Sequence, residues 1–247
     1  MQNYKMTIAY DGRRYKGFRK TKTSSETSIQ GKLETILKKK YETDIEVIGA
    51  VNTDASVHAM EQVVNFKVPV ADTAKAIRDY FETYLPDDII TLSVEQADER
   101  FQSRYQLKSV TYEYRLWKSD AVLRPLFDRQ RVNRMEDTLT IGLMKEAAKL
   151  LVGEHDFAAF STKAKTKSTV KELFELTVEA DDNEVIIKMK ADGYLLNMER
   201  IIVGTLIQVG LCQRELADVE KALVSQNRKY AGHKAMAPAL TLVSIEY

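Results

Sequence analysis

The chain has 247 residues, of which 44% are hydrophobic and 30% are charged. This composition is typical of a folded globular protein and excludes a disordered or collagen-like chain. The length allows one large domain or two lobes of about 100 to 150 residues. With 37 basic and 36 acidic residues, the net charge of +1 by itself favours no class of partner.

The first half of the chain predicts six elements in the order strand, helix, strand, strand, helix, strand. They cover residues 6–10, 29–37, 45–50, 64–68, 74–84 and 90–94. Thr27 and Gln30 fit a capping box at the start of the first helix, and Lys38 to Lys40 complement the dipole at its end. This order is that of a ferredoxin-like split βαβ unit.

The second half predicts a long strand, a helix, a hairpin, two helices and a closing strand. They cover residues 110–117, 141–151, 174–178 with 185–189, 198–209, 216–223 and 240–244. His155 and Asp156, just after Gly153, are interpreted as a helix-end motif without chemistry. We therefore predict an α+β protein of two similar α/β lobes, residues 1–105 and 106–247.

No stretch of about 18 apolar residues occurs and no secretory signal sequence begins the chain, so we expect no membrane association. The single Cys212 has no partner for an internal disulfide, and the three histidines lie far apart in sequence. Neither pattern predicts a metal site. We expect a cytoplasmic protein that holds no metal.

A short polar loop lies between the strands predicted at residues 45–50 and 64–68, and Asp54 is at its centre. Asn52, Thr53, Asp54 and Ser56 are ordinary turn residues, because their side chains hydrogen-bond nearby backbone. A lone aspartate in such a loop is more often structural than catalytic. The residues of the loop alone therefore leave both interpretations open.

Basic residues gather in two loops, which is the main feature of the charge distribution. The first run contains Arg13, Arg14, Lys16, Arg19, Lys20 and Lys22, and the second contains Lys163, Lys165, Lys167 and Lys171. Such runs suit an anionic polymer held along one face, but solvated loops have the same composition.

Three further side chains are candidates for a site. Tyr112 and Tyr114 alternate along one predicted strand and share a face, where either ring suits the core or a stacking surface. Arg200 lies in an apolar helical segment, where a charge needs a partner.

These residues belong to a longer ordered pattern that resembles the TruA-type tRNA pseudouridine synthases. The signature loop of that family reads Arg-Thr-Asp-Ala-Gly-Val-His-Ala, and residues 52–59 here read Asn-Thr-Asp-Ala-Ser-Val-His-Ala. The resemblance covers nearly the whole chain. Its other parts are Tyr10-Asp11-Gly12, Ser28-Ile29-Gln30, Gln62-Val63-Val64, Phe101 with Arg104, Tyr112-Glu113-Tyr114, residues 153–157, and Met198 with Arg200 and residues 202–204.

The resemblance implies a pseudouridine synthase fold, in which two ferredoxin-like lobes share a mixed, mostly antiparallel sheet with a central cleft. It implies that Asp54 is the catalytic aspartate, that Tyr112 lies against the target uracil, and that Arg200 pairs with Asp54. It further implies a homodimer that isomerises uridines 38–40 of the tRNA anticodon stem-loop without a cofactor. The expected RNA-binding residues are Asn52, Arg13, Arg14, Lys16, Arg19, Lys20, Arg104, Lys163, Lys165 and Lys167.

Several residues depart from the family pattern. Asn52 replaces an arginine that helps displace the flipped base, and Val51 and Ser56 replace glycines. Gln102, Phe18 and Lys171 replace a histidine, a tryptophan and an arginine. The residues assigned to chemistry are kept, whereas several that handle RNA are not. Two alternatives to the main hypothesis follow: an RNA-binding protein or tRNA chaperone with little catalysis, and an isomerase that modifies another RNA.

Overall fold

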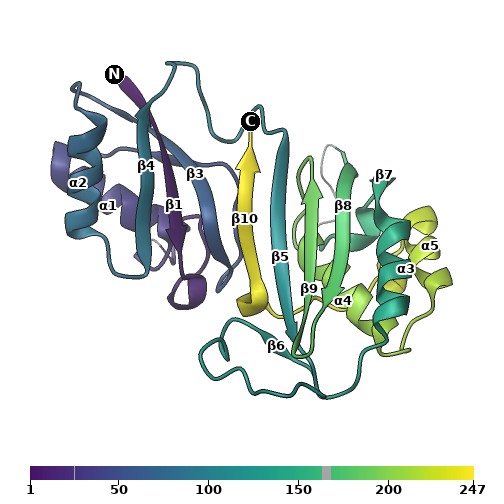
Figure 1. The fold of residues 1–247 in the computed structure, drawn as a ribbon. Helices are drawn as coiled ribbons and strands as arrows, with labels where there is room; N and C mark the ends of the chain where they lie inside the picture. The colour runs from purple at the N-terminus through teal and green to yellow at the C-terminus, as the bar shows by residue number, and fades with distance from the viewer. Residues whose placement is uncertain (25, 163–167) are drawn as a thin grey trace. The chain divides into compact units, whose positions relative to one another are not determined.

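In the computed structural model, which describes residues 1–24, 26–162 and 168–247, internal contacts divide the chain into two units (Figure 1). Unit 1 comprises Met1–Lys108 and Thr241–Tyr247, and unit 2 comprises Ser109–Leu240. The lobes expected from sequence were residues 1–105 and 106–247. The division by contacts differs mainly in the C-terminal strand: Thr241–Tyr247 belong to unit 1, where Thr241 and Leu242 pair with a strand of that unit.

Unit 1 contains the six regular elements expected from the first half of the chain, in the expected order. They are β1 (Gln2–Tyr10), α1 (Ile29–Tyr41), β2 (Val47–Gly49), β3 (His58–Val68), α2 (Ala74–Tyr84) and β4 (Ile89–Gln96), with a short 3-10 helix η1 (Gly12–Arg14) and the C-terminal β10 (Leu240–Glu246).

The sheet of unit 1 has the strand order β4-β1-β3, with β2 paired to β3. These pairs are antiparallel. This is the strand order of a ferredoxin-like fold, as the sequence predicted. The strand β10 pairs in parallel with the first residues of β3, His58 and Ala59. The sheet is therefore mixed but mostly antiparallel.

The two helices of unit 1 begin at hydroxyl caps. Ser28 accepts a hydrogen bond from Gly31 N at 3.1 Å and starts α1, and Thr73 does the same for α2. The capping box predicted from Thr27 and Gln30 is wrong, because the helix begins one residue later. The Gln30 amide instead donates to the Val47 carbonyl oxygen of β2.

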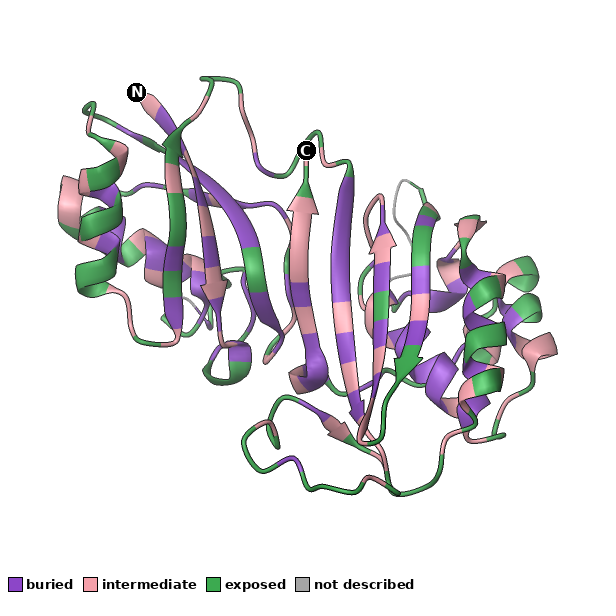
Figure 2. Cartoon of the chain, in the orientation of Figure 1, coloured by how far each residue is buried: buried purple, intermediate pink, exposed green. Residues whose placement is uncertain are grey.

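The apolar faces of these elements form the core of unit 1 (Figure 2). Met6 and Ile8 of β1 are fully buried, and Phe81 of α2 packs on Phe66 of β3 with ring centroids 6.1 Å apart. Each such side chain contributes roughly 1.5–3 kcal/mol when it leaves water. The core therefore fixes β3, and β3 begins directly after the Asp54 loop.

Unit 2 contains the predicted long strand, helices and hairpin, together with two strands that the sequence analysis missed. Its regular elements are β5 (Ser109–Trp117), β6 (Asn133–Arg134), α3 (Ile141–Leu151), β7 (Gly153–Asp156), β8 (Val170–Ala180), β9 (Glu184–Ala191), α4 (Met198–Gly210) and α5 (Leu216–Ser225), with the 3-10 turns η2 (Ala158–Phe160), η3 (Arg228–Tyr230) and η4 (Ala237–Ala239).

The sheet of unit 2 has the antiparallel order β5-β9-β8-β7. The helix-end interpretation of His155 and Asp156 is wrong, because both lie in β7 and pair with Lys171 and Val170 of β8. Gly153 makes this possible with a φ of +109°, which turns the chain sharply from α3 into the strand. Within the described residues, no helix has the length and apolar character needed to cross a bilayer.

Candidate active site

Asp54 lies in unit 1 on the loop of residues 50–57 that joins β2 to β3. Its side chain is half-buried, whereas the neighbouring Thr53 and Val57 are buried. Val57 N donates to the Asp54 carbonyl oxygen at 3.2 Å, which closes a tight turn. Within that turn Ser56 has a φ of +67°, in the left-handed region that favours glycine. The loop thus presents a carboxylate at the surface from an anchored backbone.

Two buried side chains hold this loop from beneath. The Tyr10 hydroxyl lies 2.8 Å from Thr53 Oγ1, and the Gln62 amide donates to the Val51 carbonyl oxygen at 2.9 Å. Burial raises the pKa of Tyr10 to about 12, so its hydroxyl stays neutral at physiological pH and keeps its hydrogen bond. The residue directly before Asp54 is therefore fixed by a polar contact inside the core.

The loop after β1 holds the Asp54 loop from a second side. Phe18 N donates to the Thr53 carbonyl oxygen at 3.1 Å, and Ser56 N donates to the Tyr15 carbonyl oxygen at 3.2 Å. A Cβ atom at Gly17, which has a φ of +96°, would lie 2.7 Å from the Thr53 oxygen. The two backbones therefore touch at a point where only glycine fits.

His58 completes this attachment. It is buried, and its Nδ1 accepts a hydrogen bond from Gly12 N at 3.2 Å. A Cβ at Gly12 would lie 1.9 Å from the Val57 carbonyl oxygen. The sequence left His58 open as a structural residue or an RNA contact. Its burial and its bond place it in the internal framework of the two loops.

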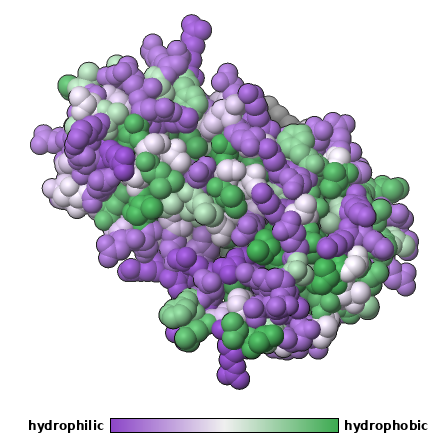
Figure 3. All heavy atoms as spheres, in the orientation of Figure 1, coloured by the Kyte–Doolittle hydropathy of each residue, from purple (hydrophilic) through white to green (hydrophobic). Residues whose placement is uncertain are grey.

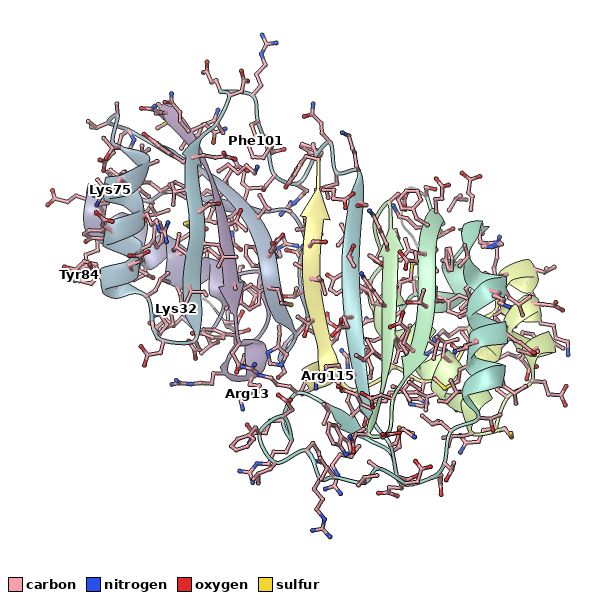
Figure 4. The ribbon with its side chains drawn as sticks, in the orientation of Figure 1. Arg13, Lys32, Lys75, Tyr84, Phe101 and Arg115 are labelled. Carbon is pink, nitrogen blue, oxygen red and sulfur yellow. The ribbon has the colours of Figure 1, made fainter. Side chains whose placement is uncertain are left out.

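The basic residues of the loop after β1 are exposed, whereas the glycine and aromatic residues of that loop are buried (Figure 4, Arg13). Arg13 makes a bidentate pair with Asp11, at 2.7 to 3.0 Å, Arg14 lies 3.5 Å from Asp88, and Lys20 pairs with Glu34. In the described part of the chain, Lys16 and Arg19 make no such ion pair. Exposed cations therefore surround the backbone that positions Asp54.

The other predicted RNA-binding residues fall into two groups. Asn52 and Arg104 are exposed in unit 1. Lys163, Lys165 and Lys167 lie outside the residues that the structure describes.

Tyr112 and Tyr114 lie in unit 2 on the same buried face of β5. The Tyr112 ring packs edge-on against Tyr194, with centroids 5.2 Å apart. Burial raises the pKa of Tyr114, and the positive charge of Arg200 lowers it by a smaller amount. Both tyrosine rings are therefore part of the core of unit 2.

Arg200 lies in the first turn of α4, and backbone contacts fix its orientation. Its Nε donates to the Ala235 carbonyl oxygen at 2.7 Å, and Ala235 N donates back to the Arg200 carbonyl oxygen at 3.0 Å. A Cβ at Gly204 would lie 1.8 Å from the His233 carbonyl oxygen, so the helix and this segment touch. The Arg200 guanidinium, a charge in an apolar segment of the sequence, is thus oriented by its hydrogen bond to the backbone at Ala235.

The candidate residues accordingly form two sets, each described within its own unit. Asp54, Asn52 and the basic loop belong to unit 1, and Tyr112 and Arg200 belong to unit 2. The sequence analysis did not assign the supporting roles of Tyr10 and Gln62. A weak signal existed, since a tyrosine and a glutamine at the ends of predicted apolar strands need buried partners.

Unit 1 also has a cavity of about 810 Å³, which is separate from the Asp54 loop. It lies at the opposite end of β3, where Asn65, Phe66 and Lys67 line it together with Gln102 and Tyr105. Among the described residues no cluster of three or more His, Cys, Asp or Glu side chains is arranged to bind a metal ion.

Comparison with known proteins identifies the class. The family described as tRNA pseudouridine synthase matches residues 6–106 and 147–247 of the chain, which include Asp54 and Arg200. The chain belongs to this family, and the protein is therefore an isomerase. The matched ranges contain most of both units described above.

Curated relatives match over the full length of both chains. The tRNA pseudouridine synthase A of Bacillus sp. (strain KSM-64) is 42% identical over 248 residues. The tRNA pseudouridine synthase A 2 of Bacillus cereus (strain ZK / E33L) is 40% identical, and the tRNA pseudouridine synthase A 1 of Clostridium tetani is 38% identical. Each covers 100% of both chains. A solved Cbf5-Nop10-Gar1 complex matches 97% of this chain and 48% of that chain, with 13% identity and a TM-score of 0.36, too low to support an argument.

Proposed function

We propose that this protein converts uridine to pseudouridine in the anticodon stem-loop of tRNA, at positions 38–40, with Asp54 as the catalytic carboxylate. The observation that carries the proposal is the Asp54 loop itself. A half-buried carboxylate projects from a backbone held by Tyr10, Gln62 and the loop after β1. Such rigid support is what a group needs if it must meet one atom of a substrate.

The reaction is an isomerisation, so the atoms balance without a co-reactant. The bond from uracil N1 to C1′ of the ribose breaks, the base rotates, and C5 forms the new bond to C1′. The proton on C5 is lost and N1 gains one. An ionised Asp54 serves by attacking the sugar, attacking the base, or removing a proton.

The two residues of unit 2 have complementary roles in this proposal. Arg200, whose Nε donates to the Ala235 carbonyl oxygen, is the proposed partner of Asp54, as the family resemblance implies, because a guanidinium paired with a carboxylate keeps that carboxylate ionised. Tyr112 lies against the flipped uracil and offers a stacking surface and a hydroxyl.

The RNA is held by the cations around the Asp54 loop. Lys16 and Arg19 are the first candidates for phosphate contacts, because Arg13, Arg14 and Lys20 must exchange carboxylate partners to bind phosphate. The stacked uridine leaves its stem to reach Asp54. As in the family resemblance, we place the protein in the cytoplasm as a homodimer.

The direct test is to incubate the protein with unmodified tRNA transcripts and to map pseudouridine at each position. We expect modification at positions 38–40 and none with Asp54→Asn. Asp79→Asn, which changes an exposed carboxylate of α2, is the matched control and should retain full activity. Absence of product from every tRNA, or full activity of the Asp54→Asn protein, contradicts the proposal.

A second candidate function is RNA binding with little catalysis. It is favoured by the exposed Asn52 in place of the family arginine and by Ser56, whose left-handed backbone suits the family glycine. The change Asn52→Arg distinguishes the two. If turnover rises strongly while tRNA affinity changes little, Asn52 limits catalysis and the second candidate describes the natural protein better. If turnover is already high and does not change, the second candidate is wrong.

Modification of a different RNA is the remaining alternative. Pseudouridine mapping across total cellular RNA, with and without the gene, separates it from the main proposal. Sites lost only from tRNA support the main proposal, and sites lost only from another RNA contradict it.

A further inference from the structure

The loop of residues 118–132, which we call the β5–β6 loop, has an unusual outer surface. Four of its apolar side chains are exposed: Val122, Leu123, Leu126 and Phe127. Phe127 is the extreme case, with 95% of its surface exposed. In Figure 3 the loop forms the lower edge of unit 2, where green apolar spheres alternate with purple polar ones. Exposed apolar groups gathered in one segment of a folded protein mark a contact site.

The loop is nevertheless anchored at its base. Trp117 Nε1 donates to the Leu123 carbonyl oxygen at 2.9 Å, and Leu123 N donates to Asn183 Oδ1 at 3.0 Å. Pro125 and Val132 are buried, so the loop has an inner and an outer side. The outward direction of Phe127 is therefore part of the fold of the loop.

The charged residues of the β5–β6 loop indicate which kind of partner its outer side can bind. Both carboxylates of the loop pair with cations near its base, Asp120 with Lys118 at 3.7 Å and Asp128 with Arg115 at 3.3 Å (Figure 4, Arg115). Arg124 and Arg129 are also exposed on the loop, and both are positively charged. An exposed aromatic ring among arginines is the combination that binds single-stranded nucleic acid, because the ring stacks on a base and the cations hold the flanking phosphates.

A second copy of the chain suits this surface less well. In a symmetric contact the same patch of both copies meets, so two loops that each carry a net positive charge approach one another. Like charges placed together oppose association. An RNA strand meets the same arginines with opposite charge.

We propose that the β5–β6 loop is a second RNA-binding surface, in which Phe127 stacks on an unpaired base and Arg124 and Arg129 contact the adjacent phosphates. This inference rests on the proposed function, which makes RNA the substrate. None of these residues belongs to the RNA-binding set expected from the sequence. The sequence did contain a signal for this surface. Residues 122–129, between β5 and β6, read Val-Leu-Arg-Pro-Leu-Phe-Asp-Arg and mix apolar residues with arginines.

The test measures binding of an unmodified tRNA transcript to the full-length protein over a range of salt concentrations. Phe127→Ala should weaken binding about tenfold, since stacking on an aromatic ring contributes about 1–3 kcal/mol per base. Phe127→Leu keeps an apolar group but no ring and should weaken it similarly, whereas Phe127→Trp should bind as well as the natural protein. Arg129→Gln should lower the slope of log affinity against log salt by about one.

Matched controls change exposed residues of the same kind elsewhere in unit 2. Val224→Ala on α5 and Lys145→Gln on α3 should leave affinity unchanged. Three results overturn the proposal. The first is a tRNA affinity of Phe127→Ala equal to that of the natural protein, and the second is the same result for Phe127→Leu. The third is a Phe127→Ala protein that no longer self-associates in sedimentation but binds tRNA with unchanged affinity. The last result assigns the loop to contact between copies of the chain.

The outcome is separable from that of the proposed function. If pseudouridine forms while Phe127→Ala binds tRNA normally, only the loop inference fails. If no pseudouridine forms but Phe127→Ala weakens binding, the loop inference stands and the isomerisation proposal fails.

Discussion

The Asp54 loop and the β5–β6 loop both reach the surface, but they are held in opposite ways. The Asp54 loop is fixed from within, by the Tyr10 hydroxyl beneath it and by Gly17 against its backbone. The β5–β6 loop is tied at its base, at Leu123 and Asp128, and its large apolar side chains face outward. The first arrangement suits a group that must meet a single atom, and the second suits a surface that adapts to a flexible strand.

Among changes to the supporting residues, the largest effect is expected from Gly17→Ala, which adds a side chain where the two backbones touch. The new Cβ meets the Thr53 carbonyl oxygen at 2.7 Å, and the backbone φ of +96° is strained for alanine. We expect a loss of about 2 kcal/mol in the free energy of unfolding and at least a tenfold loss of turnover. Denaturant unfolding and single-turnover kinetics measure the two.

The matched control is Gly142→Ala in α3, where a Cβ meets nothing within 4 Å. It should stabilise the protein by about 0.5–1 kcal/mol, because alanine favours a helix more than glycine does. Equal behaviour of the two variants would show that the close approach at Gly17 does not matter.

An intermediate effect is expected from Tyr10→Phe, which removes the hydroxyl beneath Thr53 and keeps the ring. We expect about 1 kcal/mol of destabilisation and a several-fold fall in kcat, with KM for tRNA unchanged, since Tyr10 positions the loop and is buried away from RNA. Tyr247→Phe is the control, because it removes a hydrogen bond to the Ser103 carbonyl oxygen in the same unit. A similar fall in kcat for both variants would indicate general destabilisation instead of positioning.

The smallest effect is expected from Ser56→Gly. Ser56 has a φ of +67°, so glycine should relieve strain and stabilise the protein by roughly 0.5–1 kcal/mol after its larger chain entropy is included. Ser56→Ala keeps the Cβ and should give no gain. Thermal unfolding checks both, and a gain in the alanine variant would assign the effect to the hydroxyl.

Much of the fold could be predicted from local patterns. Alternation and helical spacing predicted the order of unit 1, because β1 buries alternate residues over most of its length and α2 buries Ile77 and Phe81 on one stripe. The strand β7 was missed since it has only four residues and no clear alternation. The start of α1 was misplaced by one residue because Thr27 has a glutamine three residues later, as a capping box requires, whereas Ser28 has Gly31 there.

The site could be predicted only in part. Asp54 stood out by its setting, but its role, and those of Tyr112 and Arg200, followed only from the family resemblance. The clamp on Arg200 uses the carbonyl oxygen of Ala235, and every residue has such an oxygen. The contact at Gly17 depends on two backbones meeting in space, which a spacing along the sequence does not reveal.

The central claim is that the carboxylate of Asp54 performs the isomerisation. Because the proton on C5 of uracil is lost when pseudouridine forms, tRNA labelled with tritium at C5 of its uridines reports the reaction directly. With enzyme in excess, the natural protein should release tritium, and Asp54→Asn should release it at least about 1,000-fold more slowly while binding tRNA with similar affinity. Release at the natural rate from Asp54→Asn would contradict the account.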